Sequence, residues 1–535
     1  MSDQINNTLV DSLVEGARSK KVSRRQFMEG TMAAGLSVAA ASSLWATKVH
    51  AQTPKTGGTY RVGVHDGNTT DSLDPGTTEA VYMIQLNHAF RSFLTEITNE
   101  NDIGGDLATS WEASDDASEW RFELAQGVEF HDGKTMTSAD VVHSLNYHRG
   151  DDSTSAAKSL FSDVTDIVSD GDNAVVVKLS TGNADLPYLL SDYHLVIGSA
   201  DAEGNIDWAN TPGTGPYKIA SHEPGVETIL ERNENYFRDT YFDGVHFLTI
   251  NDPNARQTAL VTGQVDAVTE VDLKTVSLLQ RRPDLKITEI ASGAHCTIPM
   301  FCDTEPFSDV NVRLALKYGI DRQAIVDKIL LGHGSIGNDS PIGPTLPYYH
   351  EMEQRSYDPD RAKFHLKEAG LDSLAVDISA SDSAFSGAVD AAILFQESAS
   401  AAGIDLNVVR EPNDGYWSNV WLVKPFVFVQ WGARPTPDVM FSLAYKSDAA
   451  WNESRWQNAR FNELLLQAKA ELDQTARAAM YAEMQELCHS DGGTIVPFFR
   501  NRVNVYSNKL GHAESMAGNW ELDGARSFQR WWFNA

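Results

Sequence analysis

Residues 107–142 read LATSWEASDDASEWRFELAQGVEFHDGKTMTSADVV, and this stretch decides the fold. Apolar and polar side chains alternate from Trp120 to Leu124, which is the pattern of a strand with one buried face. Asp132-Gly133 then supplies a tight turn, and Thr137 stands where the first turn of a helix needs a side-chain acceptor. The stretch therefore predicts short antiparallel strands followed by a capped helix.

Strands and helices alternate on both sides of this stretch. We predict strands at 59–64, 174–179, 227–231, 245–250, 425–429 and 494–499, and helices at 79–93, 254–262, 310–318, 322–331, 360–369, 390–402, 462–472 and 475–488. The strand at 425–429 is apolar throughout, as in a sheet that is covered on both faces. Interspersed elements of this kind indicate an α/β architecture in several lobes.

Length and charge narrow the classes of function. The chain has 535 residues, with 43 Lys and Arg against 74 Asp and Glu, a net charge of −31. This length exceeds that of a single hydrophobic core, and 42% hydrophobic residues exclude intrinsic disorder. Nucleic acid is not an expected partner, because its phosphates would be repelled by so acidic a protein.

The sequence gives no support for a catalytic or cofactor-binding motif. Gly332 to Gly337 match G-x-G-x-x-G, but a helix precedes them and 338–341 cannot open one, so we predict a loop. Cys296, Cys302 and Cys488 are predicted to be unpaired. The sequence contains no nucleophile elbow, zinc-protease motif or phosphate loop, so we expect no catalysis and no cofactor or metal.

The N-terminus is typical of an export signal. Arg24 and Arg25 precede an uncharged stretch at 30–47, and small residues lead up to Ala51. This order resembles a twin-arginine signal peptide, residues 1–51, cleaved after Ala51. A membrane anchor is the alternative, and the Gly, Ser and Thr content of the stretch disfavours it. We expect export by the Tat machinery to the periplasm.

Four later segments complete a resemblance to a known family. Taken with 107–142 and in the same order, the segments 213–218, 231–237, 263–267 and 306–316 resemble the extracellular solute-binding proteins of the peptide/nickel class, family 5. The resemblance covers nearly all of 57–535. It implies an α/β, two-lobed periplasmic-binding-protein clamp, type II-like, with an extra inserted domain.

The resemblance also implies a division of the chain. Lobe I combines 52–93, 210–300 and 500–535, the inserted domain II spans 94–209, and lobe III spans 301–499. Two hinge crossings are expected, one at Cys296 to Cys302 and one at Pro497 to Arg500. Closure of the lobes on a solute would then be a shift between open and closed populations.

The implied function is that of a receptor and not of an enzyme. A monomer would bind a peptide or peptide-like, possibly anionic solute between its lobes and deliver it to an ABC permease in the inner membrane. Alternatives are a receptor for an opine, organic acid, sugar or metal chelate, a sensor, and, less favoured, an exported hydrolase on the same scaffold.

The candidate ligand-binding residues begin with Arg434. In peptide-binding relatives, the segment after a strand that ends in Trp carries an Asp for the amino group of the peptide. Here Trp431 is followed three residues later by Arg434, so the sign of the charge is reversed. A guanidinium suits a carboxylate, sulfonate or phosphate of the solute. The alternative is a structural ion pair with Asp438 or another carboxylate.

The other candidates are aromatic and polar. Flat indoles can wall a pocket for a small organic solute, although packing in the core is the alternative for each of them. These candidates are Trp417, Trp421, Trp431, Trp451, Asn452, His295 and Asp382. Asp382 lies in the stretch where dipeptide binders carry an Arg-x-Tyr for the carboxylate of the peptide, and no cation is present there.

Overall fold

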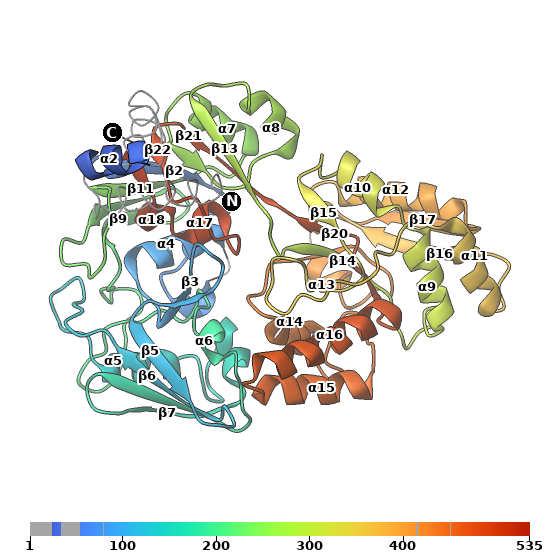
Figure 1. The fold of residues 1–535 in the computed structure, drawn as a ribbon, viewed down its shortest axis with the longest axis horizontal. Coiled ribbons are helices and arrows are strands. Elements are labelled where there is room, and N and C mark those ends of the chain that lie inside the picture. The colour runs from blue at the N-terminus through green and yellow to red at the C-terminus, as the bar shows by residue number, and fades with distance from the viewer. Residues whose placement is uncertain (1–23, 34–53, 79, 413–415, 450, 535) are drawn as a thin grey trace.

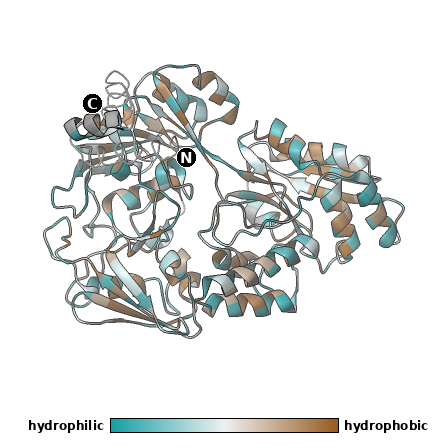
Figure 2. Ribbon diagram, viewed as in Figure 1, coloured by the Kyte–Doolittle hydropathy of each residue, from teal (hydrophilic) through white to brown (hydrophobic). Residues whose placement is uncertain are grey.

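The computed structural model describes residues 24–33, 54–78, 80–412, 416–449 and 451–534, as two halves joined by extended strands (Figure 1). In Figure 2 hydrophobic and hydrophilic residues alternate on the strands and on the helices alike. Among the described residues, no helix combines the length and the apolar character that a membrane crossing requires.

A seven-stranded mixed sheet forms the centre of one half. Its strand β2 lies parallel to β11 and β12, and the other neighbours pair antiparallel. The predicted strands at 59–64, 227–231 and 245–250 are confirmed within one residue. The order across the sheet is β13 (Leu285–Ile290), β21 (Arg502–Ser507), β12 (Ala267–Val268), β2 (Thr59–Val64), β11 (Gly244–Thr249), β10 (Glu227–Arg232) and β9 (Tyr217–Glu223).

Helices and the C-terminal tail cover this sheet. The helices predicted at 79–93 and 254–262 are present, the first of them shorter than predicted. The buried Trp531 anchors the tail in the core. The elements are α2 (Arg24–Ala33), α4 (Val81–Phe90), α7 (Pro253–Val261), α8 (Leu273–Leu279), α17 (Glu521–Ala525), α18 (Ser527–Arg530), and a small sheet of β1 (Pro54–Lys55), β23 (Trp532–Asn534) and β22 (Leu510–Gly511).

The stretch at 107–142 folds as predicted. Strand β6 pairs antiparallel with β5 on one side and β8 on the other, in the order β5-β6-β8-β7. Thr137 and Asp140 form a capping box at the start of α5, which satisfies backbone N–H groups that a helix leaves unpaired. The elements are β3 (Thr95–Ile97), β4 (Ile103–Gly105), β5 (Ala108–Ala113), β6 (Glu119–Leu124), α5 (Ser138–Asn146), β7 (Val164–Ser169), β8 (Ala174–Leu179) and α6 (Leu186–Leu189).

The second half holds a sheet in the order β15-β20-β14-β18, with β19 beside β14, and the parallel pair β16–β17. All six helices predicted beyond residue 306 are present. The strands are β14 (His295–Pro299), β15 (Gly334–Ile336), β16 (Leu374–Ala380), β17 (Ile404–Arg410), β18 (Val429–Trp431), β19 (Thr494–Ile495) and β20 (Phe498–Arg500). The helices are α9 (Val310–Gly319), α10 (Arg322–Lys328), α11 (Pro359–Glu368), α12 (Ala388–Ser400), α13 (Tyr416–Asn419), α14 (Pro437–Ala444), α15 (Ala459–Ala470) and α16 (Gln474–Ser490).

Three local predictions were wrong. The strand expected at 425–429 is β18, displaced towards Trp431, because Phe426 and Val427 form only single bridges, to Met300 just after β14 and to Ser379 of β16. The strand expected at 494–499 divides at Pro497, which has no N–H to donate. The loop expected at 332–337 contains β15, where a Cβ on Gly334 would lie 2.5 Å from a carbonyl oxygen of β20.

Two chain crossings join the halves (Figure 1). The first lies at 291–294, between β13 of the large sheet and β14 of the other half. It precedes the predicted Cys296 to Cys302, because pairing with β18 already begins at His295. The second crossing, between β20 and β21, lies at Asn501, next to the predicted position. All three cysteines are free, as predicted.

Separate hydrophobic clusters underlie the fold. One draws its buried residues from 94–197, one from 296–498, and a third from 60–90, 217–267 and 506–531. A domain normally has a hydrophobic core of its own, so three clusters are expected for lobe I, domain II and lobe III. The boundaries of the lobes themselves remain a prediction.

Candidate functional site

Arg434 lies in the loop between β18 and α14. Its Nη1 donates to the carbonyl oxygen of Gly432 at 3.3 Å, and its Cζ lies 5.6 Å from the ring centroid of Trp431. The guanidinium therefore rests against an indole, which limits its orientations. In the part of the chain that the structure describes, it forms no ion pair with any carboxylate.

Asp438, one predicted partner of Arg434, is engaged elsewhere. Thr436 caps α14 and Pro437 opens it, so Asp438 lies in the first turn of the helix. Its neighbours are Ser442, which donates to it at 3.4 Å, and the charged groups Asp185, Lys469 and Arg477. The sequence proximity of Arg434 and Asp438 thus does not produce an ion pair.

The loop at 191–194, in the other half of the molecule, contributes to the electrostatic environment of Arg434. Burial lowers the pKa of Arg434, and Tyr193 and Asp192 counteract that effect. His194 donates to Oδ1 of Asp192 from its backbone N–H at 3.0 Å and from Nδ1 at 2.6 Å. Burial opposes ionisation of Asp192, but these hydrogen bonds outweigh it and hold its pKa below the usual range.

The Tyr193 ring is part of an aromatic group on this side. It packs edge-on against Trp520, with ring centroids 5.4 Å apart, and lies 4.1 Å from the His194 ring. Trp520 directly precedes α17 in the C-terminal tail. We did not predict these residues from the sequence, because no motif marks them and their contact joins segments more than 300 residues apart.

His295 lies beside Trp431 on the sheet of the second half. The two residues are direct partners across the antiparallel strands β14 and β18, so their side chains share one face. Nδ1 of His295 lies 2.9 Å from the carbonyl oxygen of Gly293, and the side chain is 1% exposed. Burial and, to a lesser extent, the charge of Arg434 lower the pKa of His295 to about 4, although the hydrogen bond to Gly293 opposes the shift, so the ring is neutral at pH 7.

Three of the predicted tryptophans form one cluster. The ring centroids of Trp421, Trp431 and Trp451 lie 5.8 to 6.3 Å apart. Glu453 is buried beneath them and accepts hydrogen bonds from the indole Nε1 of Trp421 at 2.9 Å and of Trp431 at 3.2 Å. Burial raises the pKa of Glu453. Trp451 is 40% exposed and presents the open side of the cluster.

The other predicted residues lie apart from this arrangement or outside the described residues. The Asn452 side-chain amide donates within its own loop, to the carbonyl oxygen of Trp456 at 2.9 Å. Asp382 is exposed and accepts from the backbone N–H of Gly387 at 3.1 Å, ahead of α12. The side chains of Trp417, Arg24 and Arg25, together with Ala51, lie outside the described residues.

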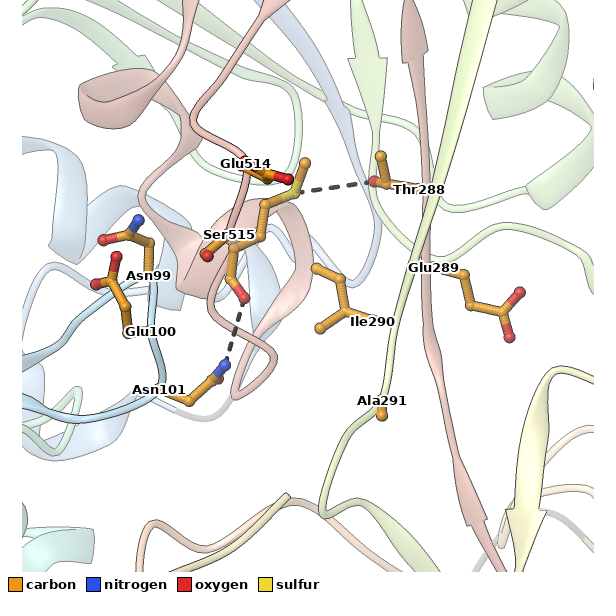
Figure 3. Close-up of a pocket in the computed structure, with 10 residues that line it drawn as sticks. Asn99, Glu100, Asn101, Thr288, Glu289, Ile290, Ala291, Glu514 and Ser515 are labelled. Carbon is orange, nitrogen blue, oxygen red and sulfur yellow. Dashed lines mark hydrogen bonds between the residues drawn. The ribbon is translucent and has the colours of Figure 1, made fainter. Parts of the chain in front are cut away.

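A pocket of about 620 Å³ lies next to the first crossing (Figure 3). Its carboxylates are Glu100, Glu289 and Glu514, and Figure 3 shows them on different segments around the opening. None of the predicted ligand-binding residues lines it. Among the described residues, no group of three or more His, Cys, Asp and Glu side chains could hold a metal ion.

The two halves also touch away from the crossings. Arg477 of α16 forms an ion pair with the buried Asp185, which precedes α6, at 2.7 Å. Lys469 of α15 pairs with Asp163, and the carbonyl oxygen of Lys469 accepts from the backbone N–H of Ala184 at 2.7 Å. We call these two ion pairs the latch, because they hold the two halves together at a place away from the two chain crossings.

Asp438, close to the charged groups of the latch, makes the stability of the fold depend on pH. Burial and the charge of Asp185 raise the pKa of Asp438 from 3.8 to about 6, although Lys469 and Arg477 oppose the shift. The unfolded chain releases this proton near pH 4 and the folded chain near pH 6. The ionised form is therefore disfavoured in the fold, and this contribution lowers stability as the pH rises from 4 to 6.

We accordingly expect Asp438→Asn to stabilise the protein at pH 7.5, by up to about 3 kcal/mol, because the amide cannot ionise. Below pH 4 the stability of the variant should equal that of the parent. Guanidinium unfolding at several pH values measures the difference, with Asp405→Asn, at an exposed position of β17, as the control for removal of a charge. A variant less stable than the parent at pH 7.5 would contradict the assignment.

Comparisons with known proteins agree with this architecture. The family described as bacterial extracellular solute-binding proteins, family 5 Middle, matches residues 102–453. The chain is 26% identical to the oligopeptide-binding protein AppA of Bacillus subtilis (strain 168) over 514 residues, which cover 88% of this chain and 92% of AppA.

Solved structures are similar over nearly their whole length. The periplasmic binding protein DppA from Helicobacter pylori, in complex with the peptide STSA, matches with a TM-score of 0.75 at 22% identity, covering 90% of this chain and 99% of DppA. AgaA from A. tumefaciens R10, in complex with agropinic acid, matches with a TM-score of 0.74 at 23% identity, covering 89% and 99%. These matches establish the two-lobed fold.

Proposed function

Because this chain belongs to the bacterial extracellular solute-binding proteins of family 5, we propose that it is a receptor that closes its two lobes around a small anionic solute. The observation that carries the proposal is the guanidinium of Arg434, which rests on Trp431 and forms no ion pair with a carboxylate among the described residues. Arg434 is only partly buried, so a solute can reach it, and the planar fork of a guanidinium fits a carboxylate with two parallel hydrogen bonds.

Closure follows from the position of the two walls. Arg434 and Trp431 belong to the predicted lobe III, and Asp192 and Tyr193 to the predicted domain II. A solute that contacts both walls binds the closed form more tightly than the open form, and this difference in affinity shifts the population towards closure. The crossings at 291–294 and Asn501 are the segments where the backbone would bend.

The biological setting of the proposal follows the family. The chain would be exported by the Tat machinery, cleaved after Ala51 and act in the periplasm as a monomer that passes its intact solute to an ABC permease. The names of the similar proteins include ligands as different as an oligopeptide and agropinic acid. The cation at Arg434 favours solutes that offer a carboxylate here, whether peptide-like or an opine or other organic acid.

A thermal-shift screen with matched pairs tests the proposal. Each carboxylic acid in a panel of peptides, opines and organic acids is compared with its own amide. We expect at least one acid to raise the unfolding midpoint by several degrees and its amide to leave it unchanged, since a ligand at one hundred times its Kd stabilises by about 2.7 kcal/mol. Equal shifts from an acid and its amide would contradict an anion site.

A further inference from the structure

Glu453 is the buried carboxylate beneath the cluster of Trp421, Trp431 and Trp451. Its Oε1 accepts from Nε1 of Trp431 at 3.2 Å and its Oε2 accepts from Nε1 of Trp421 at 2.9 Å, so each oxygen receives one indole N–H group. The residue is 3% exposed. Because an indole has a single N–H donor at one edge of a flat ring, this hydrogen bond and the ring contacts around it fix the orientation of Trp431.

The loop that carries Glu453 is itself held in place. On one side, the side-chain amide of Asn452 donates to the carbonyl oxygen of Trp456 at 2.9 Å. On the other side, the backbone N–H of Cys302 donates to the carbonyl oxygen of Ser454 at 2.8 Å. Asn452, Glu453 and Ser454 are all buried. The carboxylate therefore projects from a fixed backbone, which a residue that positions others requires.

Trp431 connects this carboxylate to Arg434. The guanidinium carbon of Arg434 lies 5.6 Å from the centroid of the Trp431 ring, and its Nη1 donates to the carbonyl oxygen of Gly432 at 3.3 Å. Both contacts are made at the end of β18. A change in the orientation of the Trp431 ring would therefore displace the surface on which the guanidinium rests.

We propose that Glu453 is a positioning residue of the solute site: its hydrogen bond fixes the indole of Trp431, and the indole fixes the direction of the Arg434 guanidinium. This inference rests on the proposed function and adds a residue that acts on the solute through two others. The advantage is preorganisation, because a guanidinium that is already oriented loses less side-chain entropy when a carboxylate binds to it.

Glu453→Met tests the proposal, because methionine is unbranched and of similar length but offers no oxygen acceptor. The probe is the acid that gives the largest thermal shift in the matched panel, and isothermal titration measures its Kd. We expect the Kd to rise at least about fivefold, the factor that corresponds to one hydrogen bond. Glu453→Gln keeps one oxygen acceptor, so it should recover part of the loss. An unchanged Kd in Glu453→Met would overturn the inference.

A double-variant cycle separates positioning from a general loss of packing. If Glu453 acts through Arg434, Glu453→Met should have no further effect on the Kd in a protein that already carries Arg434→Met. Equal weakening in the two backgrounds would overturn the inference. Asp491→Asn is the matched control, because Asp491 also accepts from an indole, Nε1 of Trp456 at 2.8 Å, but lies outside the cluster. Weakening by Asp491→Asn equal to that by Glu453→Met would overturn the inference as well.

Trp431→Phe breaks the same hydrogen bond from its other end and serves if Glu453→Met does not fold. It keeps a flat ring beneath Arg434 but removes the N–H that binds Glu453, so we expect a similar rise in Kd. Fluorine NMR of protein labelled with fluorotryptophan observes the ring directly, with the Trp431 resonance assigned from its loss in Trp431→Phe. This resonance should move in Glu453→Gln and stay in place in Asp491→Asn. A Trp431 resonance that is unmoved in Glu453→Gln would overturn the inference.

The failure of this inference differs from the failure of the proposed function. A Kd that Arg434→Met leaves unchanged, or a panel in which no acid binds, would overturn the proposed function and this inference with it. A Kd that is weakened by Arg434→Met but unchanged in Glu453→Met and Trp431→Phe would overturn the positioning role alone.

Discussion

Replacement of Arg434 by methionine is expected to weaken solute binding by at least about 30-fold in Kd. The guanidinium has no carboxylate partner of its own in the described structure, so its removal leaves the anion of the solute buried and unpaired. Truncation of one partner of a buried charged hydrogen bond costs about 2–5 kcal/mol. Isothermal titration of the solute found in the screen gives the Kd of each variant.

Two further variants sharpen this experiment. Arg434→Lys keeps the charge but loses the planar fork, so we expect an intermediate Kd. Arg455→Met is the matched control: Arg455 also lies against an aromatic ring, that of Phe301, but pairs with the exposed Asp303. Binding that is unchanged in Arg434→Met, or weakened equally in Arg455→Met, would contradict the assignment of Arg434.

Replacement of Arg477 by methionine should open the latch. This variant leaves Asp185 buried without its cation, and breaking a buried pair by removing one partner costs about 3–5 kcal/mol. We expect a lower unfolding midpoint, and a larger radius of gyration in the presence of solute, because the contact between the halves is lost. Thermal unfolding and small-angle scattering measure the two effects.

The double variant Asp185→Leu with Arg477→Met is the control for the latch. It removes both charges, so most of the lost stability should return, as it does when buried ion pairs are replaced by apolar groups. If Arg477→Met alone leaves both the midpoint and the radius unchanged, the ion pair does not hold the halves together.

The sequence was most informative where structure is local. The strands and the capped helix within 107–142 depend on alternation, a turn and a capping side chain that lie close together in the chain, and they form as predicted. The placement of Trp431 and Arg434 after a short strand was also local, and the structure has both side by side at the end of β18.

Contacts between distant segments could not be predicted in this way. Asp438 is four residues from Arg434, yet the start of α14 directs it to Asp185, Lys469 and Arg477. Asp192 and Tyr193 influence the pKa of Arg434 although some 240 residues separate them, and this influence depends on the arrangement of the two halves. The apolar run at 425–429 has the pattern of one buried strand. An apolar pattern indicates burial on both sides but does not indicate the backbone partners of each residue.

A crystal structure of the protein purified from its host, with the solute that it retains, would test most directly whether the clamp grips an intact anion. Our account predicts a chemically unmodified compound enclosed between the halves, with an acidic group within hydrogen-bonding distance of the Arg434 guanidinium. A compound seated in the pocket of Figure 3, or one whose acidic group lies far from Arg434, would contradict it.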